Sequence, residues 1–531
     1  MLDVNAYDRH VAARLLDFFG SGTSWQRRLW AVGVAMGLKE VLEGCEAAQS
    51  GVLSAGALRN LCHELEVLAG NDPGVGDRRE RNLLQTSLRS LSNMDRPQAG
   101  GVDCLVIEQV LSRVEARYLG RWENALRDEA SRPTPERAAR RIATHLLDAG
   151  FSETYLHRWW TYRISYESGI RSLADLVGDA QDLVNQPPSV FEILVAFSSV
   201  PGTGSNMPSN WRSPSAVSDW LSENGYDPRN LRQAGGFLLR IEARDVHAAV
   251  EHVSEIVERL AARSNLGTRS RLQPIREVWV RGGKETHALK RISRGVEVRA
   301  LARENQLYSE SATNNIDDAL ELLGSLNEGP PGPAVASGWA AVEALLLGPG
   351  DAKERGVAGD RLATLVACSY PRAELTALAY AHSKKGKNAL VKALKSASSN
   401  RDRSALIAQE VLDHQPLCLD SESDRAAETR MRALLSEPRR ALSDVEQYAC
   451  KTLRRLYRQR NLVLHWGRTN AVCLRAALRT AAPLVGAGVD RIAHAWFTGD
   501  TSPLELAARA KLRLELLGTS GGVSPLELLE S

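Results

Sequence analysis

Hydrophobic positions recur at helical spacing through the first 185 residues of the chain, and glycine, proline and aspartate interrupt them. The expected helices are 24–48, 55–70, 81–94 and 103–130. Thr134 followed by Pro135 predicts the start of a further helix, because proline fits the first helical position, where its missing amide hydrogen is not needed. The region 1–185 is therefore expected to be helical.

The pattern changes after Pro188, where apolar runs become short and strand-like. The candidate strands are 190–197, 235–243, 276–280 and 295–299. A helix is expected over 245–263, between two of these strands. Strands that alternate with helices predict a small central α/β sheet domain, which we place at 186–305.

A proline-rich segment follows, with Glu-Gly-Pro-Pro-Gly-Pro at 328–333. It predicts a stiff, non-helical hinge, because proline lacks an amide donor and restricts the residue before it. The hinge separates a helix at 314–326, which could belong to either side, from a C-terminal helical domain that we place at 306–516. The last residues, 517–531, contain Thr-Ser-Gly-Gly and are expected to form a flexible tail. The chain as a whole is predicted to be mainly α.

Composition excludes several classes of protein. With 531 residues, 43% hydrophobic and 25% charged, the chain is typical of globular proteins. No run approaches the roughly 18 apolar residues of a membrane span, and residues 1–5 lack the pattern of a signal peptide, so a cytoplasmic location is expected. The seven cysteines form no Cys-x-x-Cys pair and no metal-ligand spacing, so they are expected to be reduced and mostly buried. No metal ion or cofactor is expected.

The segment Arg-Gln-Arg-Asn-Leu-Val-Leu-His-Trp-Gly ends at Gly467 and carries Arg460 and His465. Ser443 followed by Glu446 has the capping-box pattern and predicts the start of a helix, and Gly467 predicts its end. Arg460 and His465 would then lie in the last two turns. The same pair near a helix C-terminus also complements the helix dipole and needs no further purpose.

The two side chains suit the chemistry of RNA cleavage. Histidine takes and gives a proton near neutral pH, and arginine presents a fixed fork of donors to phosphate oxygens. In this interpretation, His465 transfers the proton of an attacking ribose 2′-OH, and Arg460 stabilises charge on the phosphoryl group. The products would be a 2′,3′-cyclic phosphate and a 5′-OH, formed without a metal ion.

Arg460, Asn461, three apolar residues and His465 resemble the Arg-x4-6-His motif of HEPN domains (higher eukaryotes and prokaryotes nucleotide-binding), in which a polar residue commonly follows the arginine. Residues 337–346, with Glu343 inside an apolar face, and 359–363 resemble the first two helices of bacterial members. The resemblance covers about the last 200 residues. It implies a four-helix bundle in which an insertion precedes the motif helix and the closing helix follows it at 474–496. It also implies that Asn461 belongs to the catalytic set and that Glu343 supports it.

A second copy of the chain is also expected. Five residues of α-helix turn through roughly 140°, so Arg460 and His465 do not share one face of a regular helix. A single copy would therefore aim poorly at one phosphate. HEPN nucleases are known for composite sites at dimer interfaces, and the resemblance implies a homodimer or a larger even-numbered assembly.

Candidate RNA-binding residues are local, because a net charge of +3 does not mark a nucleic-acid binder by itself. One group is a lysine cluster, and the other is a basic rim near Arg460. The cluster contains Lys384, Lys385 and Lys387, and the rim contains Lys451, Arg454, Arg455, Arg458 and Arg468. A solvated loop and the wet face of a helix are the alternative interpretations.

By analogy with the family, the chain is expected to be an endoribonuclease effector in anti-phage defence or toxin-type growth arrest, cleaving transfer RNA or messenger RNA. The N-terminal regions would regulate it, in response to a co-encoded regulator or a phage-derived trigger. Two alternatives remain open. The C-terminal domain can be a non-catalytic HEPN fold that binds a nucleotide or a partner, or the chain can be a helical scaffold subunit of a complex.

Overall fold

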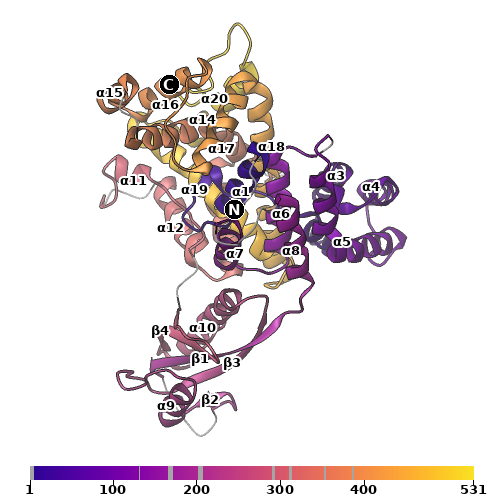
Figure 1. Cartoon of the computed structure of the whole chain (residues 1–531), viewed down its shortest axis with the longest axis vertical. Helices are drawn as coiled ribbons and strands as arrows, with labels where there is room; N and C mark the ends of the chain where they lie inside the picture. Colours follow the sequence, from indigo (N-terminus) through magenta and orange to yellow (C-terminus); the bar gives the residue numbers. More distant parts are fainter. Residues whose placement is uncertain are drawn as a thin grey trace. The chain divides into compact units, whose positions relative to one another are not determined.

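The computed structural model describes residues 5–130, 132–165, 172–200, 207–289, 293–309, 314–351, 354–385 and 388–530. The protein is mainly α-helical, as predicted (Figure 1). It forms two compact units. The helical unit comprises Met1–Asp148, Trp160–Gln181 and Arg294–Ser531, and the sheet unit comprises Ala149–Trp159 and Asp182–Ser293. The helices before and after the sheet therefore fold together in one unit.

The N-terminal half is a succession of helices. They are α1 (Ala6–Phe19), α2 (Val34–Gln49), α3 (Ala55–Gly70), α4 (Arg78–Ser92), α5 (Val102–Arg127), α6 (Pro135–Asp148), α7 (Glu153–Ser165) and α8 (Leu173–Asn185), with short 3-10 turns at η1 (Trp25–Arg27) and η2 (Pro73–Val75). The helix predicted over 24–48 is wrong in its first third, because η1 and an extended segment precede α2. The other predicted helices are present, with ends shifted by a few residues.

The C-terminal helices contain the segment that resembles HEPN domains. They are α11 (Ala300–Arg303), α12 (Asn315–Glu328), α13 (Pro331–Leu346), α14 (Val357–Lys385), α15 (Ala389–Ser396), α16 (Asn400–Leu412), α17 (Glu422–Ser436), α18 (Pro438–Trp466), α19 (Leu474–Gly499) and α20 (Pro503–Leu516). Each of α13, α14, α18 and α19 contacts the other three. The insertion between the second and third of these helices consists of α15, α16 and α17.

Two predicted helix boundaries are wrong, and both helices begin at a proline. The segment 328–333 is not a hinge, because α13 begins at Pro331 and only two residues separate it from α12. Ser443 does not start the motif helix, which begins at Pro438. In both cases a proline occupies the first helical position, where no amide donor is required.

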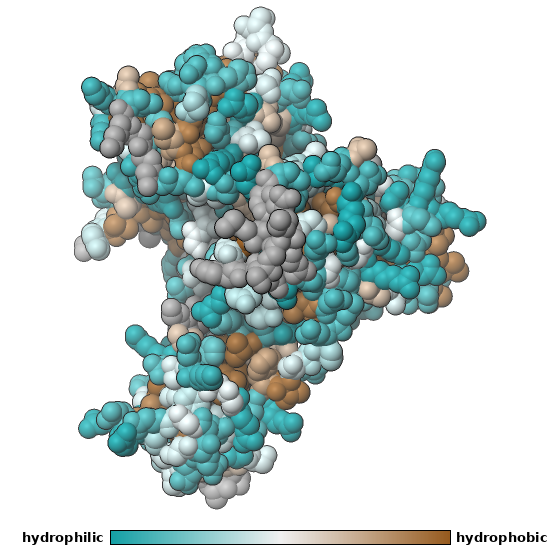
Figure 2. All heavy atoms as spheres, viewed as in Figure 1, coloured by the Kyte–Doolittle hydropathy of each residue, from teal (hydrophilic) through white to brown (hydrophobic). Residues whose placement is uncertain are grey.

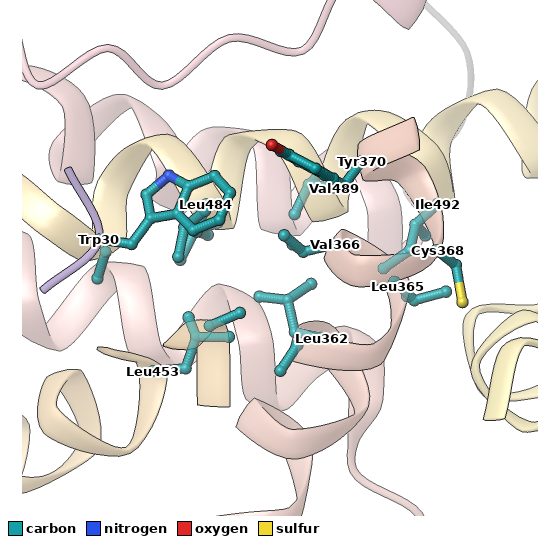
Figure 3. Packing of buried hydrophobic residues seen from close by; sticks show 14 of the residues in the cluster. Trp30, Leu362, Leu365, Val366, Cys368, Tyr370, Leu453, Leu484, Val489 and Ile492 are labelled. Carbon is teal, nitrogen blue, oxygen red and sulfur yellow. The ribbon is translucent and has the colours of Figure 1, made fainter. Parts of the chain in front are cut away.

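One hydrophobic core joins the two ends of the chain. Trp30, which precedes α2, lies among side chains of the C-terminal helices, and its ring centroid is 5.8 Å from that of Tyr370 on α14 (Figure 3). Ion pairs add to this junction, since Arg27 Nε lies 2.6 Å from Glu374 Oε1, and Glu374 is fully buried. The region predicted to be a separate N-terminal part thus completes the core of the C-terminal helices.

The predicted flexible tail, 517–531, is packed as far as the structure describes it. Leu528 is buried in the core. Arg401 pairs with Glu527 at 2.7 Å and with Glu530 at 3.3 Å. The Gly-Gly pattern is typical of a mobile end, but buried leucine and ion pairs outweigh its conformational entropy.

The sheet unit contains a five-stranded antiparallel sheet in the order β2-β3-β1-β4-β5. Its elements are β1 (Ser189–Ser199), β2 (Trp211–Arg212), α9 (Pro214–Glu223), β3 (Gly236–Ala243), α10 (Val246–Thr268), β4 (Gln273–Val280) and β5 (His287–Ala288). Apolar clusters involving α10 and α9 contain alternate residues of β1. The strand predicted at 295–299 is absent: this segment belongs to the helical unit, where the Asn327 side chain accepts from the Val296 amide at 3.1 Å.

Hydrophilic residues cover most of the face drawn in Figure 2. No helix among the described residues is long and apolar enough to cross a membrane. The cysteines are free, and five of the seven are buried, whereas Cys418 is exposed and Cys450 is partly exposed.

Candidate active site at the end of α18

The last two turns of α18 carry the motif, and Gly467 ends the helix as predicted. Gly467 adopts φ +69°, in the left-handed region that glycine enters without strain. The Arg468 amide donates to the Leu462 carbonyl at 3.2 Å, which satisfies one of the free carbonyls at the helix end. This closure fixes the backbone on which Arg460 and His465 are mounted.

Arg460 and His465 contact each other within one chain. Arg460 Nη1 lies 3.2 Å from His465 Nε2 and donates to Asn461 Oδ1 at 3.0 Å. The two side chains meet although they do not share one face of the helix. The helical rotation separates their Cβ atoms, but the long arginine side chain spans the gap. Thus, helix geometry alone does not require a second copy.

The exposures of the motif residues differ. His465 is exposed, whereas the Arg460 side chain is only 16% exposed and Asn461 is buried. A ligand can therefore contact the imidazole directly, whereas only a small part of the arginine side chain is accessible to it. Since the arginine has no acceptor atom, its contact with Nε2 requires that nitrogen to be unprotonated. We assign the neutral imidazole with a proton on Nδ1 from this geometry.

Glu343 on α13 lies beside the motif, where the resemblance to HEPN domains implies a supporting residue. Its Oε2 is 3.9 Å from Arg460 Nη2, and its Oε1 is 3.6 Å from Arg355 Nη1. Glu343 Oε1 is buried and accepts no hydrogen bond from any residue in the described part of the chain. The negative charge of the Glu343 carboxylate therefore attracts the Arg460 guanidinium.

Two members of the predicted basic rim are not on the surface. Arg455 and Arg458 are buried, and both donate to Glu40 of α2, at 2.7 Å and 3.0 Å. Burial alone would raise the pKa of Glu40, but the charges of Arg455 and Arg458 outweigh it and lower that pKa. These arginines stabilise the helical unit and are not available to RNA in this structure.

The other rim residues are partly exposed. Two of them pair with acidic residues, and the third lies on the opposite face of α18 from Arg460. Arg454 makes two hydrogen bonds to Asp360, at 2.9 Å and 2.8 Å. Arg468 pairs with Glu46 at 3.1 Å and covers the Trp466 ring at 3.6 Å. Lys451 precedes Arg460 by nine residues, which places it on the opposite face of α18 by roughly 180°. The rim thus does not surround Arg460.

Lys384, the member of the lysine cluster whose side chain the structure describes, lies far from the motif along α14. Contacts of Asp360 with Arg454 and of Thr364 with Glu446 show that α14 and α18 run antiparallel. Lys384 is exposed near the end of α14, roughly 36 Å of helix beyond Asp360 and away from the motif. The side chain of Lys385 and all of Lys387 lie outside the described residues.

Comparison with protein-family models, with curated proteins and with solved structures gives no match to this chain. The described residues also contain no group of three or more His, Cys, Asp or Glu side chains that could hold a metal ion. Sequence reasoning missed Glu40 and Asp360, the acidic partners of the rim arginines. Both lie far from α18 in the chain, so no local pattern could have identified them.

Proposed function

We propose that the chain is a metal-independent endoribonuclease whose reaction takes place at the end of α18. The observation that carries this proposal is the contact between the Arg460 guanidinium and the exposed His465 imidazole. The His465 imidazole can accept a proton and the Arg460 guanidinium carries a positive charge. The two groups are close enough to act on one phosphodiester. Asn461 accepts from Arg460 and orients it, and Glu343 lies against its other side.

The reaction follows from these groups. His465 takes the proton of a ribose 2′-OH, whose oxygen then attacks the adjacent phosphorus. The bond from phosphorus to the 5′-oxygen breaks, and that oxygen takes a proton to become a 5′-OH. Arg460 leaves its in-chain contact with His465 and donates to the phosphoryl oxygens, which become more negative in the transition state.

A second copy of the chain supplies the remaining proton in this proposal. One imidazole cannot take the proton of the 2′-OH and protonate the 5′-oxygen at the same moment. A protonated His465 from a second copy would serve as the acid, so a homodimer or a larger even-numbered assembly is proposed on chemical grounds. Light scattering tests this: a protein that remains monomeric while cutting RNA contradicts the shared site.

A non-catalytic role is the second candidate, and the position of Arg460 favours it. The guanidinium is mostly buried and lies near Glu343, and a cation near a helix C-terminus stabilises the helix dipole. In that case the domain would bind a nucleotide or a partner, or would serve as a scaffold subunit, without cleaving RNA.

Cleavage of labelled transfer RNA or messenger RNA by the purified full chain, with and without EDTA, distinguishes the two candidates. We expect EDTA-resistant cleavage to a 2′,3′-cyclic phosphate, reduced by about 10²- to 10⁴-fold in His465→Ala. Arg460→Ala is expected to lose activity as well. His63→Ala and Arg439→Ala, which change an exposed histidine on α3 and an exposed arginine at the other end of α18, are the matched controls. Uncut RNA, or equal activity in His465→Ala, favours the non-catalytic role.

The biological setting in this proposal is cytoplasmic anti-phage defence or toxin-type growth arrest, in which the other helices and the sheet unit control the nuclease. The motivating observation is that most of the chain lies outside the motif. Expression of the wild type should slow growth more than expression of the Arg460→Ala, His465→Ala double variant. Equal growth costs would contradict the toxin interpretation.

A further inference from the structure

A second cluster of cationic side chains lies on the opposite face of α18 from the motif. We infer that the groove between α3, α6 and α18 binds a small phosphomonoester, whose phosphate group contacts Arg141 and Lys451. This inference concerns a separate site and does not depend on RNA cleavage at Arg460.

The groove is a cavity of about 300 Å³ within the helical unit. Trp30, Leu65, Leu68 and Tyr448 contribute apolar surface, and Arg141 and Lys451 contribute charge. It adjoins a larger cavity of about 790 Å³, with which it shares lining residues on α3 and α18. A small ligand would fit its charged group in the first cavity and extend its organic part into the second.

Arg141 of α6 lines this groove, and its neighbour Arg140 lies against Tyr448, which also lines it. Arg141 is only 7% exposed and lines the cavity, and its Nε lies 3.4 Å from Asp72 Oδ2. Its Nη1 is buried and donates no hydrogen bond to any described residue. Arg140 Nη1 is also buried without an acceptor among the described residues, while the Arg140 guanidinium covers the Tyr448 ring at 4.2 Å. A buried guanidinium nitrogen normally has an acceptor.

Lys451 and Arg137 add positive charge at the same place. Both line the cavity, and neither makes an ion pair within 4.0 Å with a described residue. The lining also contains two acidic residues, Glu64, whose Oε2 lies 3.9 Å from Arg455 Nη2, and Asp444. Arg140, and to a smaller extent Arg141 and Lys451, lower the pKa of Tyr448 even though burial opposes this. Four cationic side chains and two anionic ones thus line the groove.

The chemistry of the groove selects the class of ligand. A phosphate group with two negative charges balances several cations better than a carboxylate with one. A guanidinium group can also donate two parallel hydrogen bonds to two oxygens of a phosphate. The apolar walls favour an organic group attached to that phosphate. Since α3 and α6 form one side and α18 the other, such a ligand would bridge the N-terminal helices and the helix that carries the motif.

Titration calorimetry of the full chain with phenyl phosphate tests the site, with inorganic phosphate and with chloride at equal ionic strength as comparisons. We expect one molecule of phenyl phosphate to bind per chain, and inorganic phosphate to bind more weakly. Lys451→Gln, which removes a partly exposed lysine, should weaken binding by about tenfold or more, the loss expected from one charge-assisted hydrogen bond. Arg137→Gln should weaken it less, because Arg137 is exposed at the edge of the groove.

Arg141→Gln should abolish binding, provided circular dichroism shows that this variant is folded. The matched control is Lys392→Gln, an exposed lysine on α15 that lies outside both cavities. If neither phosphate compound binds, or if Lys451→Gln and Lys392→Gln weaken binding equally, the inference is wrong. A variant of Arg141 that misfolds leaves Lys451→Gln and Arg137→Gln as the deciding measurements.

Discussion

The middle and the end of α18 use the same residue types for different purposes. In the middle, Arg455 and Arg458 are buried and share Glu40. At the end, Arg460 is mostly buried but contacts the exposed His465. The difference arises from the neighbours: α2 covers the middle of the helix with a carboxylate, whereas the last turn has an exposed imidazole.

The comparison shows that a cluster of arginines is not in itself evidence of nucleic-acid binding. A buried arginine needs a carboxylate partner, because an unpaired buried charge costs several kcal/mol. Once paired, it contributes nothing to the surface potential. The side chains that remain for chemistry are those that the fold leaves incompletely paired, and at α18 these include Arg460 and His465 near its end and Lys451 on the face opposite Arg460.

The largest expected effect is on stability, from Glu40→Gln. This change leaves Arg455 and Arg458 buried without a full counter-charge, so we expect the unfolding free energy of the helical unit to fall by about 3–5 kcal/mol. Calorimetry and tryptophan fluorescence during heating measure the change. Glu437→Gln is the matched control, because Glu437 pairs with Arg440 at the exposed start of the same helix. Equal stability of the two variants would contradict the conclusion that the buried ion pairs of α18 stabilise the fold more than its exposed pair does.

An intermediate effect is expected from acid. The pKa values of Glu40 and Glu374 lie below the ordinary value of 4.5, because buried arginines outweigh the opposing effect of burial. A lowered folded-state pKa stabilises the fold above the unfolded value and loses this contribution as pH falls through the folded value. The contribution of these two carboxylates to stability should therefore be level above about pH 5 and fall below it.

The acid dependence can be assigned to the buried pairs by comparing variants. Glu40→Gln should lose part of the fall below pH 4.5, since it removes one of the two carboxylates. The Glu437→Gln control should keep the wild-type profile. Thermal unfolding at a series of pH values measures this, and a difference in stability between the wild type and Glu40→Gln that stays constant below pH 5 would contradict the assignment.

The smallest expected effect on stability is that of His465→Ala. The side chain is exposed, so we expect the unfolding free energy to change by about 0.5 kcal/mol or less. Cleavage activity should nevertheless be lost, as proposed above. A loss of stability well above that level, measured in the same thermal experiment, would indicate that His465 serves the helix end and would favour the non-catalytic role.

Sequence patterns predicted those helices and strands whose positions depend on neighbouring residues in the chain. Gly467 ends α18, Asn314 caps α12, and the three main strands of the sheet lie where apolar runs predicted them. The patterns misled at 328–333, where proline was interpreted only as a helix breaker, and at Ser443, where a capping-box pattern lies inside α18. The Gly-Gly pattern near the C-terminus also misled, because burial of Leu528 could not be inferred from neighbouring residues.

For the candidate site, the sequence by itself determined that Arg460, Asn461 and His465 occupy the end of a long helix. Only the tertiary structure decided which charges are free, because Glu40 and Glu343 come from elements more than a hundred residues earlier in the chain. It also decided that Arg460 reaches His465 within one copy, and that Arg141 and Lys451 line one groove. Local periodicity fixes how a helix turns, whereas burial and ion pairing depend on what packs against it.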